Sequence, residues 1–163
     1  MDLPHVDQCW SAGPYSDWIR DCVLSYKSGR IEHRDGLVEI LAQVLKSANF
    51  SPDCIVNIPS PVDKVRCRGF DTMGELSSGL AKTLGIRHQP VLKFTRKVQD
   101  QVGLNRTERA ENIAAAFTME QLIQGQIALI DDVITTGATV SAAARTLRIF
   151  GAKKIYAISL CRT

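Results

Sequence analysis

The fold is decided by the stretch Ile127-Ala-Leu-Ile-Asp131-Asp132-Val133-Ile-Thr135-Thr136-Gly137-Ala138-Thr139. Four apolar residues precede Asp131, which is typical of a strand covered on both faces, and the alanine-rich segment after Thr139 predicts a helix. The turn between them therefore lies at the carboxyl end of a strand and at the N-terminus of a helix. Unpaired backbone N–H groups and the positive end of the helix dipole attract phosphate at such a place.

Two neighbouring carboxylates stand directly before this turn. Asp131 and Asp132 repel a phosphate, so we expect them to face something else bound beside it, and vicinal ribose hydroxyls are suitable donors. The alternative is a buried strand that enters a capped helix, but a cap needs one such residue and not the whole string. The residues expected to hold the phosphate are Thr135, Thr136, Gly137, Ala138 and Thr139.

Length and composition indicate one α/β domain. The chain has 163 residues, 45% of them hydrophobic, which is enough for one full core over residues 1–163. Aromatic residues are only 6%, and the apolar content comes mainly from Ala, Leu, Ile and Val, as expected where helices cover a parallel sheet. The net charge of +3 suits an anionic small molecule and does not by itself argue for a nucleic-acid or membrane surface.

The cysteines and the N-terminus indicate an intracellular protein. Five cysteines, without a Cys-x-x-Cys pair, argue against a disulfide framework and a local zinc clip. The first residues lack a basic region followed by an apolar one, and no stretch reaches transmembrane length. We therefore expect a cytoplasmic location and no membrane partner.

Alternating strands and helices predict a parallel sheet with right-handed crossovers. Residues 1–14 are expected to form an irregular arm and residues 95–111 a long loop. Periodicity and stop signals predict helices over 18–26, 37–45, 73–84 and 138–150, and strands over 54–58, 91–94, 114–119, 126–130 and 154–161.

The opening stretch resembles the phosphoribosyl pyrophosphate (PRPP) motif of type I phosphoribosyltransferases, in which two acidic residues precede Thr-Thr-Gly-x-Thr. Further segments resemble the ComF branch of that superfamily, the competence-associated phosphoribosyltransferase-like proteins. These segments are residues 18–30, Arg66-Cys-Arg68-Gly69-Phe70, the spacing Gln101-x-x-Leu104-x5-Arg109-Ala-Glu-Asn112-x4-Phe117, and Leu160-Cys-Arg162-Thr163.

The resemblance implies a Rossmann-like type I phosphoribosyltransferase fold, with PRPP at the carboxyl ends of the strands. It implies a small helical hood within residues 1–50, a PRPP-binding core over residues 51–163 and a flexible loop that closes over the substrate. The acidic pair would then contact the ribose hydroxyls, and Mg²⁺ would be held by substrate oxygens and water near the pair, without a direct protein ligand.

The resemblance also implies a pyrophosphate site and a catalytic loop residue. Arg96, at the start of the flexible loop, is the expected catalytic residue beside Asp131 and Asp132, although a solvated loop that never closes is the alternative. A solvated basic loop is likewise the alternative for the pyrophosphate site, above all for Lys64. The pyrophosphate residues are Pro59, Ser60, Lys64, Arg66 and Arg68.

Several points stay open at the level of sequence. The acceptor, the oligomeric state (a homodimer among the options) and the roles of Gln101, Arg109 and Asn112 are not defined. Asp71-Thr72 replaces the Asn-Gln pair usual in relatives, and Cys9 stands alone where many ComF-like proteins carry a four-cysteine zinc ribbon, so a short form and a truncated chain are both open. A non-catalytic competence protein that acts through single-stranded DNA or DNA-processing proteins is the alternative function.

Overall fold

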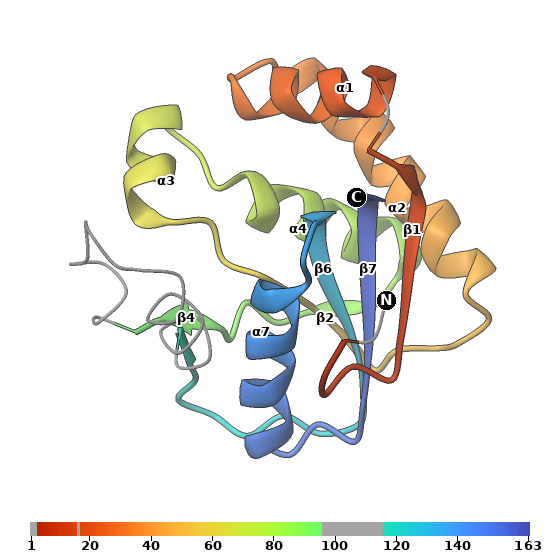
Figure 1. Ribbon diagram of the computed structural model, residues 1–163, viewed down its shortest axis with the longest axis vertical. Coiled ribbons are helices and arrows are strands. Elements are labelled where there is room, and N and C mark those ends of the chain that lie inside the picture. The colour runs from red at the N-terminus through yellow and green to blue at the C-terminus, as the bar shows by residue number, and fades with distance from the viewer. Residues whose placement is uncertain (1–2, 16, 96–115) are drawn as a thin grey trace.

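A five-stranded parallel sheet forms the centre of the computed structural model, which describes residues 3–15, 17–95 and 116–163 (Figure 1). The strand order is β1-β7-β6-β2-β3, and every neighbouring pair is parallel. The α/β fold with a parallel sheet flanked by helices is thereby confirmed. The strands are β1 (Gln8–Pro14), β2 (Cys54–Asn57), β3 (Arg87–His88), β6 (Gln126–Ile134) and β7 (Lys154–Arg162).

Helices cover both faces of this sheet (Figure 1). One face packs against α7, and the other against α2 and α4. A short antiparallel pair, β4 (Lys93–Phe94) with β5 (Phe117–Thr118), lies apart from the main sheet. The helices are α1 (Asp17–Lys27), α2 (Arg34–Ser47), α3 (Val62–Arg68), α4 (Thr72–Leu84) and α7 (Ala138–Ile149), with a 3-10 turn at Ile31–His33.

The burial of β6 on both of its faces explains why residues 127–130 are all apolar. Ile127 and Leu129 belong to the core beneath α7, whereas Ala128 and Ile130 belong to the core beneath α2 and α4. Successive side chains of a strand point to opposite faces, so a strand covered on both sides needs apolar residues at every position.

The N-terminal region is shared between the sheet and its helical covers. Strand β1 pairs with β7 from Gln8–Tyr156 to Pro14–Arg162, so the prediction of an irregular arm was wrong for residues 8–14. Gly13 and Pro14 lower strand propensity, and the partner strand lies at the other end of the chain, so local periodicity carried no signal. Helix α2 packs on the sheet, while α1 lies at the end where β6 and β7 finish (Figure 1).

Other element bounds differ from the prediction. Strand β6 continues through Ile134, whereas the sequence predicted an end at Ile130. The strand predicted over 91–94 is reduced to β4, and that over 114–119 to β5, with residues 114 and 115 outside the described part. Helix α3 was not predicted, because it buries none of its residues and so carries no apolar period. Strand β3 was not predicted either.

Leu41 tests the packing of α2 on the sheet. Its side chain is fully buried, so Leu41→Ala should lower the free energy of unfolding by about 2–5 kcal/mol through lost burial and the cavity that remains. Urea denaturation followed by circular dichroism measures the change. Leu24→Ala on α1 is the matched control, because Leu24 is 51% exposed and should shift stability by less than about 0.5 kcal/mol. Equal losses in the two variants would contradict the described core.

Candidate functional site

The acidic pair lies within the last part of β6, where the strand is still paired with β7. Asp131 is opposite Ser159, and its Oδ1 accepts a hydrogen bond from the backbone N–H of Asp132 at 2.9 Å. The Asp132 Oδ2 lies 2.5 Å from the Nζ of Lys27, the last residue of α1. The strand thus presents two adjacent carboxylates at its carboxyl end, one of them bound by a cation from the N-terminal region.

A cavity of about 380 Å³ lies at this edge of the sheet. Its lining comes from the end of β6, the turn after β2, helix α3, the start of α4, the first turn of α7 and the end of α1. Apolar side chains such as Phe94 and Met73 lie among charged ones, as in many small-molecule sites. The predicted site residues that border it are Asp131, Asp132, Thr139, Pro59, Ser60, Lys64 and Arg68.

The predicted phosphate cradle forms the turn from β6 into α7. Gly137 is the residue before the helix and has φ +75°, a left-handed conformation that glycine adopts without strain. The Thr136 Oγ1 accepts a 3.4 Å hydrogen bond from the N–H of Ala138. Thr135, Thr136 and Thr139 are exposed. The first turn of α7 therefore faces outward with hydroxyls around its N-terminus, beside the acidic pair.

The turn after β2 supplies the second group of predicted anion-binding residues. Pro59 and Ser60 are half-buried, and the Ser60 Oγ lies 3.3 Å from the Oγ1 of the buried Thr72. Lys64 and Arg68 follow on α3 and border the cavity, whereas Arg66 is exposed and is not part of its lining. The structure thus brings together four of the five predicted pyrophosphate residues.

The environment of Asp131 disfavours the ionised form of its carboxyl group. Burial, and then the like charge of Asp132, raise the pKa of Asp131 well above its ordinary range, while the hydrogen bond from the Asp132 backbone and the charge of Lys27 oppose the shift. Burial also raises the pKa of the Cys161 thiol to about 11, helped by Asp132. Cys161 is therefore an unreactive thiol, as expected for a buried cysteine.

Two polar residues of this cavity, Lys27 and Thr72, were missed as site residues. Lys27 occurs in a segment that resembles ComF proteins, but a lysine that ends an amphipathic helix normally points to solvent. Thr72 was noticed only as a departure from the Asn-Gln pair of relatives. No local pattern connects either residue to β6, because the contact depends on how α1 and α4 pack. Arg96, Gln101, Arg109 and Asn112 lie outside the described residues.

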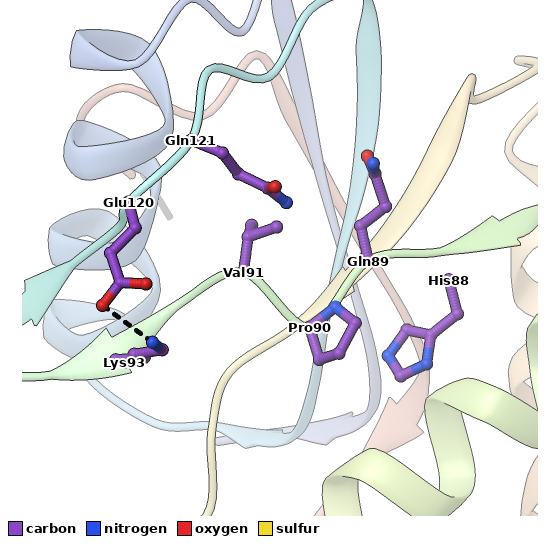
Figure 2. Close-up of a pocket in the computed structure, with 7 residues that line it drawn as sticks. All are labelled: His88, Gln89, Pro90, Val91, Lys93, Glu120 and Gln121. Atoms are coloured by element: carbon purple, nitrogen blue, oxygen red, sulfur yellow. Dashed lines mark ion pairs between the residues drawn. The ribbon is translucent and has the colours of Figure 1, made fainter.

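A second cavity of about 370 Å³ lies at the open edge of the sheet, beyond β3 (Figure 2). Figure 2 shows the Gln121 side chain reaching past Val91 toward Gln89, with the Lys93–Glu120 ion pair, 2.9 Å between Nζ and Oε1, to one side. His88 also lines this cavity. None of its lining residues is shared with the cavity of the acidic pair.

His88 connects the two cavities through Asn57. Its Nε2 lies 2.9 Å from the Oδ1 of Asn57, and the Nδ2 of Asn57 donates to the carbonyl of Ile58, which lines the first cavity. Because the Asn57 amide nitrogen is used by Ile58, its oxygen accepts, and the His88 Nε2 carries the hydrogen. Burial lowers the pKa of His88, with the carboxylate of Asp71 opposing the shift, which favours this neutral form.

The described residues contain no cluster of three or more metal-binding side chains and no helix that could cross a membrane. Within residues 3–15, 17–95 and 116–163, no group of three or more His, Cys, Asp or Glu side chains could hold a metal ion. No helix in that part of the chain is long and apolar enough to span a bilayer.

Comparison with known proteins identifies the class that this fold and site define. The phosphoribosyl transferase domain family matches residues 30–163, so the chain belongs to this family. The fold is shared with glutamine PRPP amidotransferase from B. subtilis (TM-score 0.53, 20% identity, 81% of this chain and 26% of the other). It is also shared with the allosteric regulatory enzyme of purine biosynthesis (TM-score 0.54, 18% identity, 82% of this chain and 26% of the other).

Curated relatives place the chain in the ComF branch of that family. DNA utilization protein YhgH of Salmonella typhi is 33% identical over 82% of this chain and 62% of the relative. Competence protein F of Haemophilus influenzae is 29% identical over 68% of this chain and 51% of the relative. Competence protein ComFC of Streptococcus pneumoniae is 29% identical over 91% of this chain and 65% of the relative. The chain thus spans about half to two thirds of the length of these relatives.

Asp131→Asn should make the protein more stable at alkaline pH. A carboxyl whose pKa is raised by folding holds its proton more tightly in the folded state. Its contribution to the stability of the protein is therefore fully present at low pH and is lost as the pH rises above the ordinary pKa near 3.8. The amide can still accept from the Asp132 N–H. We expect a gain on the order of 1 kcal/mol at pH 8 that shrinks toward pH 4. Thermal unfolding across pH measures it, with the exposed Asp63→Asn as control; an unchanged difference across pH would contradict the assignment.

His88 should give the opposite pH dependence. A histidine whose pKa is lowered by folding contributes stability above its ordinary value near 6.5, and this stability is lost as pH falls below that value. His88→Gln keeps a donor for Asn57 without a titrating ring, so its unfolding free energy should change less between pH 7 and pH 5 than that of the wild type. Denaturant titrations at both pH values provide the measurement, with His33→Gln as the matched control. An equally steep loss in His88→Gln would remove His88 as the cause.

Proposed function

We propose that this protein binds PRPP together with Mg²⁺ at the cavity beside Asp131 and Asp132 and transfers its 5-phosphoribosyl group with release of pyrophosphate. The observation that carries the proposal is the meeting of three kinds of group around one cavity: an acidic pair, a helix N-terminus with hydroxyls, and a basic turn. PRPP presents the matching parts, namely ring hydroxyls, a 5-phosphate and a pyrophosphate.

Each part of PRPP has a place at this edge of the sheet. The 5-phosphate would bind at the start of α7, where Thr135 to Thr139 offer N–H groups and hydroxyls. The ribose hydroxyls would donate to Asp131 and Asp132. The pyrophosphate would lie against the turn at Pro59 and Ser60, where Lys64 and Arg68 balance its charge. Arg66 and Arg96 stay predictions from the family resemblance.

The acidic pair fits a magnesium ion that is held mainly by water and substrate. Mg²⁺ keeps several waters and binds through one or two carboxylates together with substrate phosphates, and two adjacent carboxylates are what β6 offers here. When bound, Mg²⁺ would neutralise negative charge on the departing pyrophosphate. The residues of the chain would position PRPP and exclude water around its anomeric carbon.

The transfer step would form one bond at the anomeric carbon and break another. A nucleophile on the acceptor would attack that carbon while its bond to pyrophosphate breaks, and pyrophosphate would leave with the electron pair. The cations of α3 would stabilise the leaving charge, and the carboxylates would orient the ribose. The acceptor class is left open, and a cytoplasmic location and a homodimer stay predictions of the sequence.

A second function is favoured by the names of the relatives. DNA utilization protein YhgH and competence proteins F and ComFC are named for DNA use and competence. A fold can serve binding without turnover. On this view the protein would bind PRPP without converting it, or would not bind PRPP. It would act in DNA uptake or recombination through single-stranded DNA or DNA-processing proteins.

The test is calorimetric titration of PRPP with Mg²⁺ into the wild type and Asp131→Asn/Asp132→Asn. The double variant replaces two charged acceptors of the ribose hydroxyls with neutral amides, so we expect its affinity to fall about tenfold or more, since hydrogen bonds to charged groups contribute about 1.5–3 kcal/mol each and those to neutral groups less. Asp35→Asn, on an exposed part of α2, is the matched control and should bind like the wild type. Circular dichroism checks that each variant is folded.

The outcomes separate the two functions. Binding that is lost in the double variant and is accompanied by pyrophosphate release with an acceptor supports the enzyme. Binding without release supports a PRPP-responsive DNA-use protein. No binding by folded wild type contradicts the PRPP site, and salt-sensitive association with single-stranded DNA that survives Asp131→Asn would then favour the DNA-binding function.

A further inference from the structure

The last turn of α1 reaches both sides of the proposed PRPP site. Lys27 is paired with Asp132 on β6, and the neighbouring Tyr26 packs edge-on against Phe70, with ring centroids 5.5 Å apart. Phe70 belongs to the connection between α3, which carries Lys64 and Arg68, and α4. The last turn of α1 therefore contacts the acidic pair through Lys27 and the α3–α4 connection through Tyr26. Its cation, the Lys27 ammonium, is paired with the acidic residues.

The ion pair lies partly within the protein. The Lys27 side chain is 26% exposed and the Asp132 side chain 14% exposed, so solvent screens this pair less than it screens a surface salt bridge. Lys27 also lines the cavity itself. Lys27 and its present partner Asp132 thus both border the space in which a ligand would sit.

A bound sugar phosphate would change what Lys27 and Asp132 need. Hydroxyl donors that bind Asp132 would occupy the carboxylate oxygens that Lys27 now uses, and a displaced, half-buried ammonium requires another anionic partner. The ligand itself supplies one, because its phosphate oxygens would enter the same cavity. A lysine has a flexible four-carbon stem and can turn between two partners without movement of the helix.

We infer that Lys27 is an exchanging residue of this site: it neutralises Asp132 in the free protein and binds phosphate oxygens of the ligand once Asp132 accepts the ribose hydroxyls. This inference rests on the proposed function, because PRPP is the ligand that carries both groups. It assigns to the N-terminal helix a direct contact with the ligand, and it makes Lys27 a binding residue in addition to the basic residues of α3.

The experiment compares PRPP binding with Mg²⁺ by calorimetry in the wild type, Lys27→Met, Lys27→Arg and Lys82→Met. Methionine keeps the length of the side chain and removes its charge, and Lys82 is an exposed lysine on α4 that serves as the matched control. We expect Lys27→Met to bind about tenfold more weakly with a reduced dependence on salt, because one phosphate contact is lost. Lys27→Arg should retain most of the affinity, and Lys82→Met all of it.

A second measurement uses the wild type and so does not depend on how the variants fold. In ¹⁵N-lysine NMR of side-chain ammonium groups, the Lys27 signal should be visible in the free protein and move to a new position when PRPP and Mg²⁺ are added. The Lys82 signal should not move.

The outcomes distinguish this inference from the proposed function. If the wild type binds PRPP but Lys27→Met binds it equally well or more tightly, Lys27 only guards Asp132 and the exchange is wrong. An unmoved Lys27 signal in the PRPP complex would contradict it as well. If the folded wild type does not bind PRPP, the proposed function fails and the inference falls with it.

Discussion

The burial of β6 on both faces is the constraint on which the rest of the structure depends. A strand between two layers of helices can carry polar side chains only where it leaves those layers, and in this chain that point is reached at Asp131. The same end of the strand meets the N-terminus of α7 and the turn after β2, since β2 runs parallel to β6 in the sheet. Covering the strand therefore concentrates the polar groups of three elements at one edge.

That constraint explains what the sequence could predict. The apolar run, the acidic pair and the threonine-rich turn follow one another along the chain, so their places in the fold follow from local pattern alone. Pairing between distant segments has no such signal. Strand β1 is a strand because it lies beside β7, and α3 is helical although it buries nothing, so neither could be recognised from periodicity.

The same distinction holds for the candidate site. Residues in the deciding stretch and after β2 were assigned from their neighbours. Of these, Asp131, Asp132, Thr139, Pro59, Ser60, Lys64 and Arg68 border one cavity, whereas residues 135–138 are not part of its lining. Lys27 reaches the cavity only through the packing of α1. Arg66 lies two positions from both Lys64 and Arg68 but does not line the cavity. Nearness along the chain thus predicted several residues that share one cavity, but it gave no signal for Lys27, which a separate helix brings there.

The pairing of β1 with β7 has a consequence for how the protein is made. The Asp7 carboxylate accepts a hydrogen bond from the backbone N–H of Ile155, which follows 148 residues later, and β1 continues alongside β7 from there. A ribosome that adds about 5–20 residues each second needs about 7–30 s to bridge that interval. During this time the backbone of β1 has no partner strand in the sheet, and β1 can join the sheet only once β7 has left the exit tunnel. The backbone N–H and C=O groups of β1 are therefore open to pairing with other chains until β7 is made.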